Sequence, residues 1–267
     1  MPLRLAPTFR DALANADHPL AGIWVCSASP VSAEICAGSG MDWMLIDGEH
    51  SPVDLGSTLA ILHAVAAYPI TPVVRVASLD AVTIKQVLDL GAQNLLVPMI
   101  SSAAEAHAAV AAVRYPPRGK RGVGSALARS ARWNRVDGYL ENADDHVSLF
   151  VQIETSAGVD AAAEIAAVDG VDGVFVGPSD LAASMGLLGQ QTHPDVVAAV
   201  VSTFAAVRAV GKPVGVNAFA EKQAQAYVDA GADFIAVAAD VSLLARASES
   251  LALRWTPAVS AEKRASY

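Results

Sequence analysis

The sequence predicts an α/β protein built as a (β/α)8 TIM barrel, and three observations lead to this fold class. Short runs rich in β-branched residues alternate with longer, Ala-rich runs of helical period, without a linker-like break. Strand candidates such as Leu95–Val97 are almost continuously apolar, as in parallel strands buried on both faces. Eight such units fit 267 residues, because a barrel commonly uses about 250 residues as one domain. We therefore expect one domain over residues 1–267, with a doubly wound open sheet as the alternative.

The expected elements follow from this alternation, and several expected helices are followed by Gly, where a left-handed C-cap costs little. Strands are expected at Gly22–Cys26, Trp43–Asp47, Pro72–Val76, Asn94–Met99, Val147–Glu154, Gly173–Gly177, Pro213–Asn217 and Phe234–Ala238. Helices are expected at Ser32–Gly38, Val53–Ala67, Ala81–Leu90, Ala103–Arg114, Ala157–Val168, Pro194–Val210, Glu221–Ala230 and Val241–Leu253. The connection from Tyr115 to Asp145 is unusually long and basic, and because it follows a helix, a simple barrel places it at the face away from the site.

The composition excludes several functional classes. A net charge of −9 leaves no basic surface for nucleic acid or for an acidic membrane. The two cysteines, Cys26 and Cys36, are too few for a disulfide framework and are expected as buried thiols. Residues 1–20 carry charges and no apolar signal segment, and the uncharged stretch 55–74 is interrupted by Gly and Pro. We expect a cytoplasmic enzyme without a membrane span.

Carboxylates follow two adjacent expected strands at their C-terminal ends, where barrels carry their active sites. Glu154 closes the fifth strand and Asp180 follows the sixth, which places them on strands about 5 Å apart. Two carboxylates at this spacing repel unless a cation neutralises them, and oxygen ligands suit Mg²⁺ or Mn²⁺. The alternative is structural: Asp180 caps a helix starting at Leu181, and Glu154 pairs with an Arg. The residues alone leave both interpretations open.

A histidine and an arginine close two neighbouring strands and are expected to face these carboxylates across the barrel mouth. His50 has the side chain of a general base, and Arg75 that of an oxyanion stabiliser. Each has a structural alternative: the imidazole bonds a backbone carbonyl, or the guanidinium pairs with Asp47 or Glu49. Together with a metal they provide the groups needed to remove a proton from carbon next to a carbonyl.

Three further features narrow the chemistry. Gln152 shares a strand face with Glu154, because only one residue separates them. The turn Gly177–Ser179 leads into a helix whose N–H groups favour an anion, and the last two strands lack Gly-rich loops, so a carboxylate is favoured over a phosphate. A Schiff-base mechanism is disfavoured, because no Lys follows a strand; the lysines are Lys85, Lys120, Lys212, Lys222 and Lys263.

Seven segments, in this order, resemble the HpcH/HpaI family of metal-dependent (class II) 2-oxo-acid aldolases, within the pyruvate/phosphoenolpyruvate barrel superfamily. Each is weak alone, but their combination is specific. They are Trp43–Pro52, Pro72–Val76, Ile84–Ile100, Arg114–Gly124, Gln152–Thr155, Gly170–Leu181 and Ala230–Ala245.

This resemblance implies reversible aldol cleavage of 4-hydroxy-2-oxo acids to pyruvate, or a related 2-oxo acid such as hydroxypyruvate, and an aldehyde, through an enolate. The metal is then Mg²⁺ or Mn²⁺, with Co²⁺ as a further option. The implied roles are metal binding by Glu154 and Asp180, base catalysis by His50, enolate stabilisation by Arg75, and substrate contacts by Gln152 and by the backbone of Ser179 and Asp180.

The resemblance also implies an oligomer. The family assigns a residue matching Asp89 to raising the basicity of the catalytic His, yet the expected helix ends at the opposite barrel face, so Asp89 would act from a neighbouring subunit. Such aldolases are commonly hexamers of dimers that exchange a C-terminal helix, so we expect a homo-oligomer, a hexamer, that uses Val241–Leu253. Three alternatives remain: an acyl-CoA lyase, a 2-oxo-acid (oxaloacetate) decarboxylase, and a non-catalytic metal and carboxylate binder. The DGEH and RYPPRGKRG segments argue against the acyl-CoA lyase.

Overall fold

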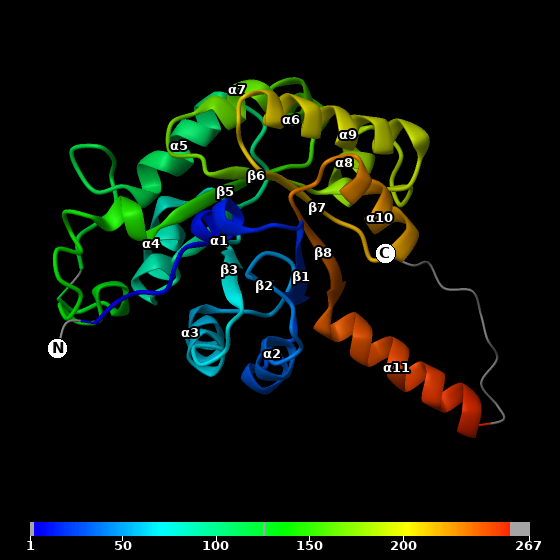
Figure 1. Ribbon diagram of the computed structural model, residues 1–267, viewed down its shortest axis with the longest axis horizontal. Helices are drawn as coiled ribbons and strands as arrows, with labels where there is room; N and C mark the ends of the chain where they lie inside the picture. The colour runs from blue at the N-terminus through cyan, green and yellow to red at the C-terminus, as the bar shows by residue number, and fades with distance from the viewer. Residues whose placement is uncertain (1–2, 125, 257–267) are drawn as a thin grey trace.

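A computed structural model describes residues 3–124 and 126–256 and shows a closed barrel of eight parallel strands surrounded by helices (Figure 1). Each strand pairs with its sequence neighbours, and β1 closes the barrel by pairing with β8. The expected (β/α)8 barrel is therefore confirmed, and the open sheet is excluded. The strands are β1 Leu20–Val25, β2 Trp43–Asp47, β3 Thr71–Arg75, β4 Asn94–Val97, β5 Ser148–Ile153, β6 Gly173–Val176, β7 Val214–Asn217 and β8 Phe234–Ala239.

The helices differ from the expected ones at three places. The helix expected at Ala157–Val168 is two helices, because the chain leaves helical geometry at Ala161, where φ is −94° and ψ is 8°. Helix α1 was not among the expected elements, and the helix expected after the Gly177–Ser179 turn, α8, begins earlier than Leu181, at Pro178. The helices are α1 Phe9–Asn15, α2 Pro30–Ala37, α3 Leu55–Ala64, α4 Ala81–Asp89, α5 Ala103–Val113, α6 Ser156–Asp160, α7 Ala162–Ala167, α8 Pro178–Ser184, α9 Pro194–Ala209, α10 Glu221–Asp229 and α11 Asp240–Trp255.

Aromatic side chains fill the N-terminal half of the barrel interior. Trp43, Phe150 and Phe234 meet there, with the rings of Trp43 and Phe234 5.7 Å apart. Room for the indole comes from Gly22 on the adjacent strand, because a Cβ at that position would lie 2.2 Å from the Trp43 ring. The opposite, C-terminal end of the barrel, here called the mouth, is the end where such barrels carry their active sites.

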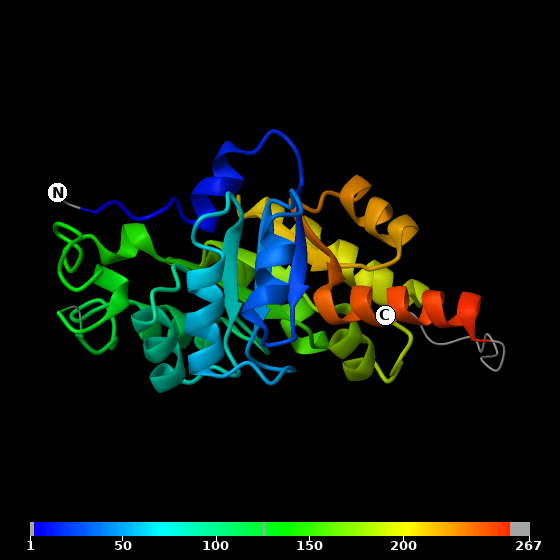
Figure 2. The ribbon, with the colours of Figure 1, turned by 90° about the horizontal axis from the view of Figure 1, so that it is seen from below.

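Helix α1 closes the N-terminal end of the barrel. Thr8 and Asp11 form a capping box that starts the helix. The ring of Phe9 lies 5.2 Å from that of Trp43, and its backbone N–H donates to Asn94 Oδ1 at 2.7 Å. Figure 2 shows α1 at the opposite end of the barrel from the start of α11.

The long connection between α5 and β5 packs beside α4 and contains two short 3-10 helices, Arg129–Ala131 and Ala143–His146. The carbonyl of Asp145 accepts a hydrogen bond from Arg10 of α1, at the N-terminal face. The connection therefore reaches the face that the sequence predicted. Within the described parts of the chain, no helix is both long and apolar enough to cross a lipid bilayer.

Candidate active site

An ion pair at the mouth of the barrel joins the ends of β2 and β3. The sheet register places Asp47 directly beside Arg75. Arg75 Nε and Nη2 approach Asp47 Oδ1 at 2.9 and 2.8 Å, and Nη1 lies 2.8 Å from Glu49 Oε2. The guanidinium also lies over the ring of Trp24, 4.5 Å from its centroid. Both ion pairs that the sequence left as alternatives for Arg75 are present, and they fix a buried guanidinium at the mouth.

The turn after β2 presents His50 to solvent. Asp47 Oδ1 accepts the backbone N–H groups of Glu49 and His50 at 3.0 and 3.4 Å, which shapes this turn. His50 Nε2 lies 3.8 Å from Glu49 Oε2, and the His50 side chain is 64% exposed. Burial raises the pKa of Glu49 and the charge of Arg75 lowers it. A histidine at the rim can therefore exchange a proton with a ligand in the mouth.

Glu154 lies deep in the mouth and is 2% exposed. Its Oε1 accepts the N–H of Met99 at 2.8 Å, and its Oε2 accepts Nε2 of Gln152 at 2.6 Å. Met99 has φ 58°, a sparsely populated conformation for a residue with a side chain. A Cβ at Gly177 would lie 2.6 Å from Glu154 Oε2, so any larger residue there would displace the carboxylate from its present position.

The charge of Glu154 is poorly compensated. Burial, aided by the negative charges of Glu49 and Asp180, raises its pKa from 4.5 to about 7, although the Met99 hydrogen bond and the charge of Arg75 oppose the shift. Within the described residues, Glu154 forms no ion pair. The sequence alternative in which Glu154 pairs with an Arg is therefore not realised in this chain.

Asp180 lies in the first turn of α8, next to Ser179, and is exposed to solvent. The helix begins at Pro178, and Gly177 stands at its N-cap without a side-chain hydrogen bond, so Asp180 does not cap a helix. The effect of Asp180 on the pKa of both Glu49 and Glu154 places the three carboxylates within one electrostatic neighbourhood.

These residues fit a divalent cation. The charge of Arg75 lowers the pKa of Glu154 but does not outweigh burial, so a bound cation would stabilise the buried carboxylate. Among the residues that the structure describes, no group of three or more His, Cys, Asp or Glu is arranged to hold a metal ion. An ion between Glu154 and Asp180 would therefore complete its coordination with water and substrate oxygens, as is usual for Mg²⁺.

The structure brings most of the predicted site together. His50, Arg75, Gln152, Glu154 and the Ser179–Asp180 turn all lie at the C-terminal ends of the strands. The sequence interpretation gave no functional role to the Glu49 carboxylate or the Met99 N–H. A role for Glu49 could have been predicted, since it lies between Asp47 and His50 in the sequence. The hydrogen bond of Met99 could not, because it depends on a backbone conformation that no residue type indicated.

Asp89 lies elsewhere. It ends α4, and its Oδ1 is 3.7 Å from Arg121 Nη2 of the long connection. No hydrogen bond or ion pair joins Asp89 to His50 within the described chain. The lysines of the described residues lie on α4, in the long connection, before β7 and on α10, away from the strand ends, and Lys263 falls outside the described residues.

Comparison with known proteins gives matches along most of the chain. A family model described as HpcH/HpaI aldolase/citrate lyase matches residues 20–247. The 4-hydroxy-2-oxo-heptane-1,7-dioate aldolase of Salmonella dublin is 51% identical over 247 residues, which is 92% of this chain and 94% of that protein. A crystal structure of an HpcH/HpaI aldolase/citrate lyase family protein from Burkholderia cenocepacia is 40% identical, with a TM-score of 0.88 over 92% of this chain and 97% of that one. The citrate synthase SbnG is 28% identical, with a TM-score of 0.81 over 92% and 97%.

Proposed function

The chain belongs to the HpcH/HpaI aldolase/citrate lyase family, and from this premise we propose that it catalyses the reversible aldol cleavage of 4-hydroxy-2-oxo acids to pyruvate, or a related 2-oxo acid, and an aldehyde. It is a carbon–carbon lyase, as its relatives' name of aldolase implies. The observation that carries the proposal is the arrangement at the barrel mouth. There Glu154 and Asp180 form no ion pair among the described residues, and Arg75 and His50 lie at neighbouring strand ends.

Glu154 and Asp180 are the residues that hold a divalent cation, Mg²⁺, Mn²⁺ or Co²⁺, in this proposal. When bound there, such an ion polarises the keto group of the substrate and carries part of the negative charge that develops on it. Gln152 supports the assignment, because its amide is fixed against Glu154 by the 2.6 Å hydrogen bond while its Oε1 is buried without a hydrogen-bond partner in the described structure. That oxygen can accept a hydrogen bond from bound substrate or water.

His50 acts as the base. In the cleavage direction its imidazole takes the proton of the C4 hydroxyl, the C4–O bond becomes a carbonyl, and the C3–C4 bond breaks. The bond's electron pair stays on the three-carbon fragment as the enolate of pyruvate. The proton then returns to C3, which gives pyruvate and restores the base. The exposed position of His50 beside Glu49 supports this role, because a ligand in the mouth can reach the ring.

Arg75 stabilises the negative charge that develops on the substrate. Its ion pairs with Asp47 and Glu49 fix the guanidinium but leave part of its five N–H donors for an oxyanion. The backbone N–H groups of Ser179 and Asp180, in the first turn of α8, bind the substrate carboxylate in this proposal.

The direct test measures pyruvate released from a panel of 4-hydroxy-2-oxo acids with and without a second carboxylate, since the Salmonella relatives are named for a heptanedioate substrate. We expect pyruvate release that EDTA abolishes and that borohydride with pyruvate leaves intact. Activity that survives EDTA but is lost with borohydride would contradict the metal mechanism. Adding oxaloacetate to the panel tests a second reaction, decarboxylation, which needs the same enolate and the same site.

A homo-oligomer, expected as a hexamer, is the proposed assembly. Helix α11 runs outward from the barrel (Figures 1 and 2), and Asp240 is its only buried residue in the described chain. Leu244 is 73% exposed and Trp255 82%, and an exposed apolar helix is typical of an interface between chains. Light scattering of the wild type and of Leu244→Glu tests this: we expect a multimer whose mass falls in the variant, and a wild-type monomer would contradict it.

Asp89 is proposed to act on His50 of a neighbouring subunit, since the two are not joined within one chain. Mixed oligomers test this proposal without relying on one variant's fold. Subunits carrying Asp89→Asn and subunits carrying His50→Ala, each nearly inactive alone, should regain a measurable share of activity when they assemble together. Mixed oligomers that stay inactive would contradict the assignment.

A further inference from the structure

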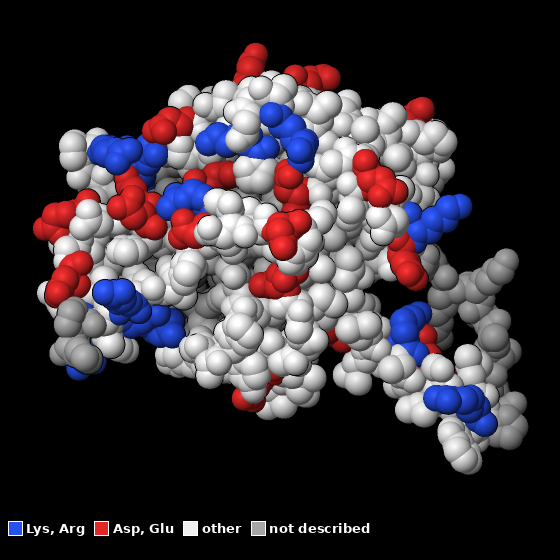
Figure 3. Space-filling model, in the orientation of Figure 1, with Lys and Arg blue, Asp and Glu red and all other residues white. Residues whose placement is uncertain are grey.

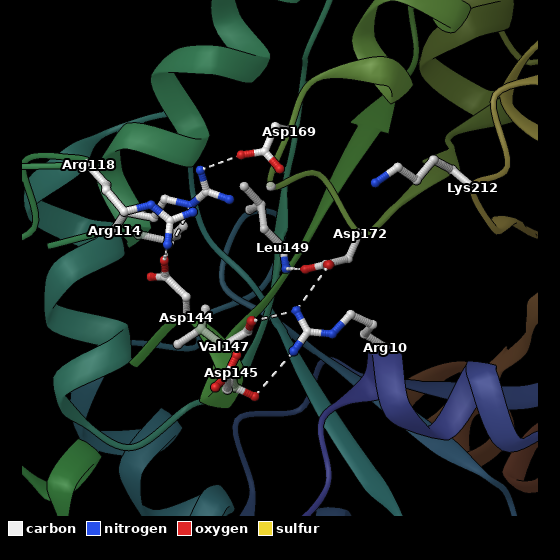
Figure 4. A pocket seen from close by; sticks show the side chains of 12 residues that line it. Arg10, Arg114, Arg118, Asp144, Asp145, Val147, Leu149, Asp169, Asp172 and Lys212 are labelled. Atoms are coloured by element: carbon white, nitrogen blue, oxygen red, sulfur yellow. Dashed lines mark hydrogen bonds and ion pairs between the residues drawn. The ribbon is translucent and has the colours of Figure 1, made fainter. Parts of the chain in front are cut away.

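A charged cavity of about 280 Å³ lies at the N-terminal face of the barrel, at the opposite end from Glu154 and Asp180. It is bounded by the starts of β5 and β6, the end of α5, α1 and Lys212, two residues before β7 (Figure 4). Figure 3 shows basic side chains gathered over this region of the face, with acidic ones between them. Residues used by the proposed aldol reaction do not line it, so any ligand there binds at a second site.

The carboxylate of Asp172 lines this cavity and is held in place by two contacts. It accepts the backbone N–H of Leu149 at 2.8 Å, which ties the start of β6 to β5. Its other oxygen lies 3.2 Å from Arg10 Nη1, and Arg10 also donates to the carbonyl of Asp145 at 3.2 Å. These contacts hold the Arg10 guanidinium at the cavity while the negative charge of Asp172 is already compensated.

A second guanidinium is held from the other side. Arg114 Nη1 lies 2.9 Å from Asp169, and its Nε is 3.8 Å from Asp144, which also pairs with Arg118 at 2.5 Å. Of the four aspartates that line the cavity, only Asp145 takes no part in an ion pair among the described residues, and it is exposed to solvent. The aspartates therefore orient the arginines and leave no compact carboxylate cluster for a cation.

Lys212 is the cation without a compensating carboxylate. Its Nζ donates to the carbonyl of Val171 at 2.6 Å, and no carboxylate of the described residues lies within ion-pair distance of it. Figure 4 shows its side chain directed into the cavity, toward the side where Leu149 and Asp169 lie. An ammonium has three N–H donors, so donors remain for a ligand.

The basic side chains at the cavity opening favour the ionised form of a nearby carboxylate. The Asp169 side chain is 87% exposed, yet its pKa is lowered, first by the hydrogen bond from Arg114 and then by the positive charges of Arg114, Arg118 and Lys212. The same cations can therefore stabilise the negative charge of a bound ligand.

We propose that this cavity binds a small oxyanion, the carboxylate or phosphate group of a metabolite, between Lys212, Arg114 and Arg10. Guanidinium groups whose orientation is already fixed bind an oxyanion with little further loss of freedom. The volume is large enough for a phosphate ester or a short dicarboxylic acid, since one water occupies about 30 Å³ in the liquid. This inference does not depend on the aldol reaction, because the two sites share no residue.

The test is calorimetric titration of the full-length, metal-free protein with inorganic phosphate and, separately, with succinate, against sodium chloride of equal ionic strength. We expect saturable binding of at least one of the two anions and none of chloride. Tighter phosphate binding identifies a phosphate ligand, and tighter succinate binding identifies a carboxylate ligand. Absence of saturable binding by both anions would overturn the proposal.

Variants locate the binding. Lys212→Met should weaken the anion affinity about 10-fold or more, because one charge-assisted hydrogen bond is lost. Arg114→Gln should also weaken the anion affinity. The matched control is Lys222→Met, an exposed lysine on α10 that does not line the cavity. Aldol activity close to wild type shows that each variant is folded. Unchanged anion affinity in both cavity variants would place the anion elsewhere and overturn the proposal.

Discussion

The two ends of this barrel carry the same residue types in opposite electrostatic arrangements. At the N-terminal face, Asp144, Asp169 and Asp172 each pair with an arginine, and Lys212 has no carboxylate partner among the described residues. At the C-terminal face, Arg75 pairs with Asp47 and Glu49, and Glu154 and Asp180 form no ion pair among the described residues. One end is therefore suited to an anion and the other to a cation.

The comparison teaches that pairing, rather than composition, decides what each end binds. The chain is acidic overall, with a net charge of −9, yet its N-terminal cavity lowers the pKa of a carboxylate while its C-terminal mouth raises one. The two ends differ because the strands are parallel: the residues at the strand starts all lie at one end of the barrel, and those at the strand ends all lie at the other.

The largest effect is expected at Glu154. Glu154→Gln removes the buried charge but keeps the side chain's shape, so kcat/KM for aldol cleavage should fall about 10³-fold, since a metal ion contributes several kcal/mol of transition-state stabilisation. The assay is pyruvate release under saturating Mn²⁺. Glu164→Gln, on the exposed face of α7, is the matched control and should retain wild-type activity. Near-wild-type activity of Glu154→Gln would contradict the claim that the C-terminal end of the barrel binds a cation through Glu154.

A smaller loss is expected at Arg75. Arg75→Lys keeps the positive charge but cannot contact both Asp47 and Glu49 with a planar fork, so kcat should fall about 10²-fold while the fold persists. Steady-state kinetics should place the loss mainly in kcat. If KM alone rises, Arg75 contributes ground-state binding and no stabilisation of the developing charge.

Metal affinity should depend on pH. The pKa of Glu154 is about 7 in the metal-free chain, so a proton competes with the cation below that pH. Calorimetry with Mn²⁺ should show affinity that rises up to about 10-fold per pH unit from pH 5 to 7 and then levels off. Affinity that is constant across this interval contradicts a role for Glu154 as a ligand.

The metal-free chain should also lose stability as pH rises. The pKa of Glu154 is raised in the folded state, so the folded chain binds this proton more tightly than the unfolded chain does. The resulting stability is present below pH 4.5 and is lost as pH rises to about 7, for a total of about 3 kcal/mol. Without metal at pH 8, Glu154→Gln should therefore melt a few degrees above the wild type. A lower melting temperature would mean that another charge already compensates Glu154.

The smallest effect is expected at the N-terminal face. Asp169→Asn removes one exposed partner of Arg114, and such surface pairs contribute little. Its melting temperature and aldol activity should match those of the wild type, while its affinity for inorganic phosphate or succinate should rise, because a competing negative charge is gone. Weaker anion binding in Asp169→Asn contradicts the assignment of the cavity.

The fold was predictable because each strand carries its own signal. The apolar runs and the Gly residues after the helices marked the strands to within two residues, and β2 matches the expected Trp43–Asp47 in full. Helix α1 was missed because its position depends on Phe9 packing against Trp43 and Phe150, and these residues are far from Phe9 in the sequence. The break at Ala161 was missed because the run of alanines there favours a continuous helix.

The candidate site was predictable as far as strand ends determine it. The positions of Arg75 and Glu154 at the C-terminal ends of their strands follow from the alignment of neighbouring strands in the sheet. The raised pKa of Glu154 could not be predicted from the register, because it depends on burial, on the N–H of Met99 and on Asp180. The N-terminal cavity was not predicted, because Arg10, Arg114 and Lys212 come from three distant parts of the chain that only the closed barrel brings together.

Proton exchange at the methyl group of pyruvate tests the central claim most directly, namely that the unpaired carboxylates at the C-terminal mouth support enolate formation with a bound cation. The protein is incubated with pyruvate in D₂O, with Mg²⁺ because it is diamagnetic, and the methyl signal is followed by proton NMR. We predict loss of the methyl signal in the wild type with Mg²⁺, and no loss with EDTA or in Glu154→Gln. Exchange that persists at the wild-type rate in Glu154→Gln or with EDTA would contradict the account.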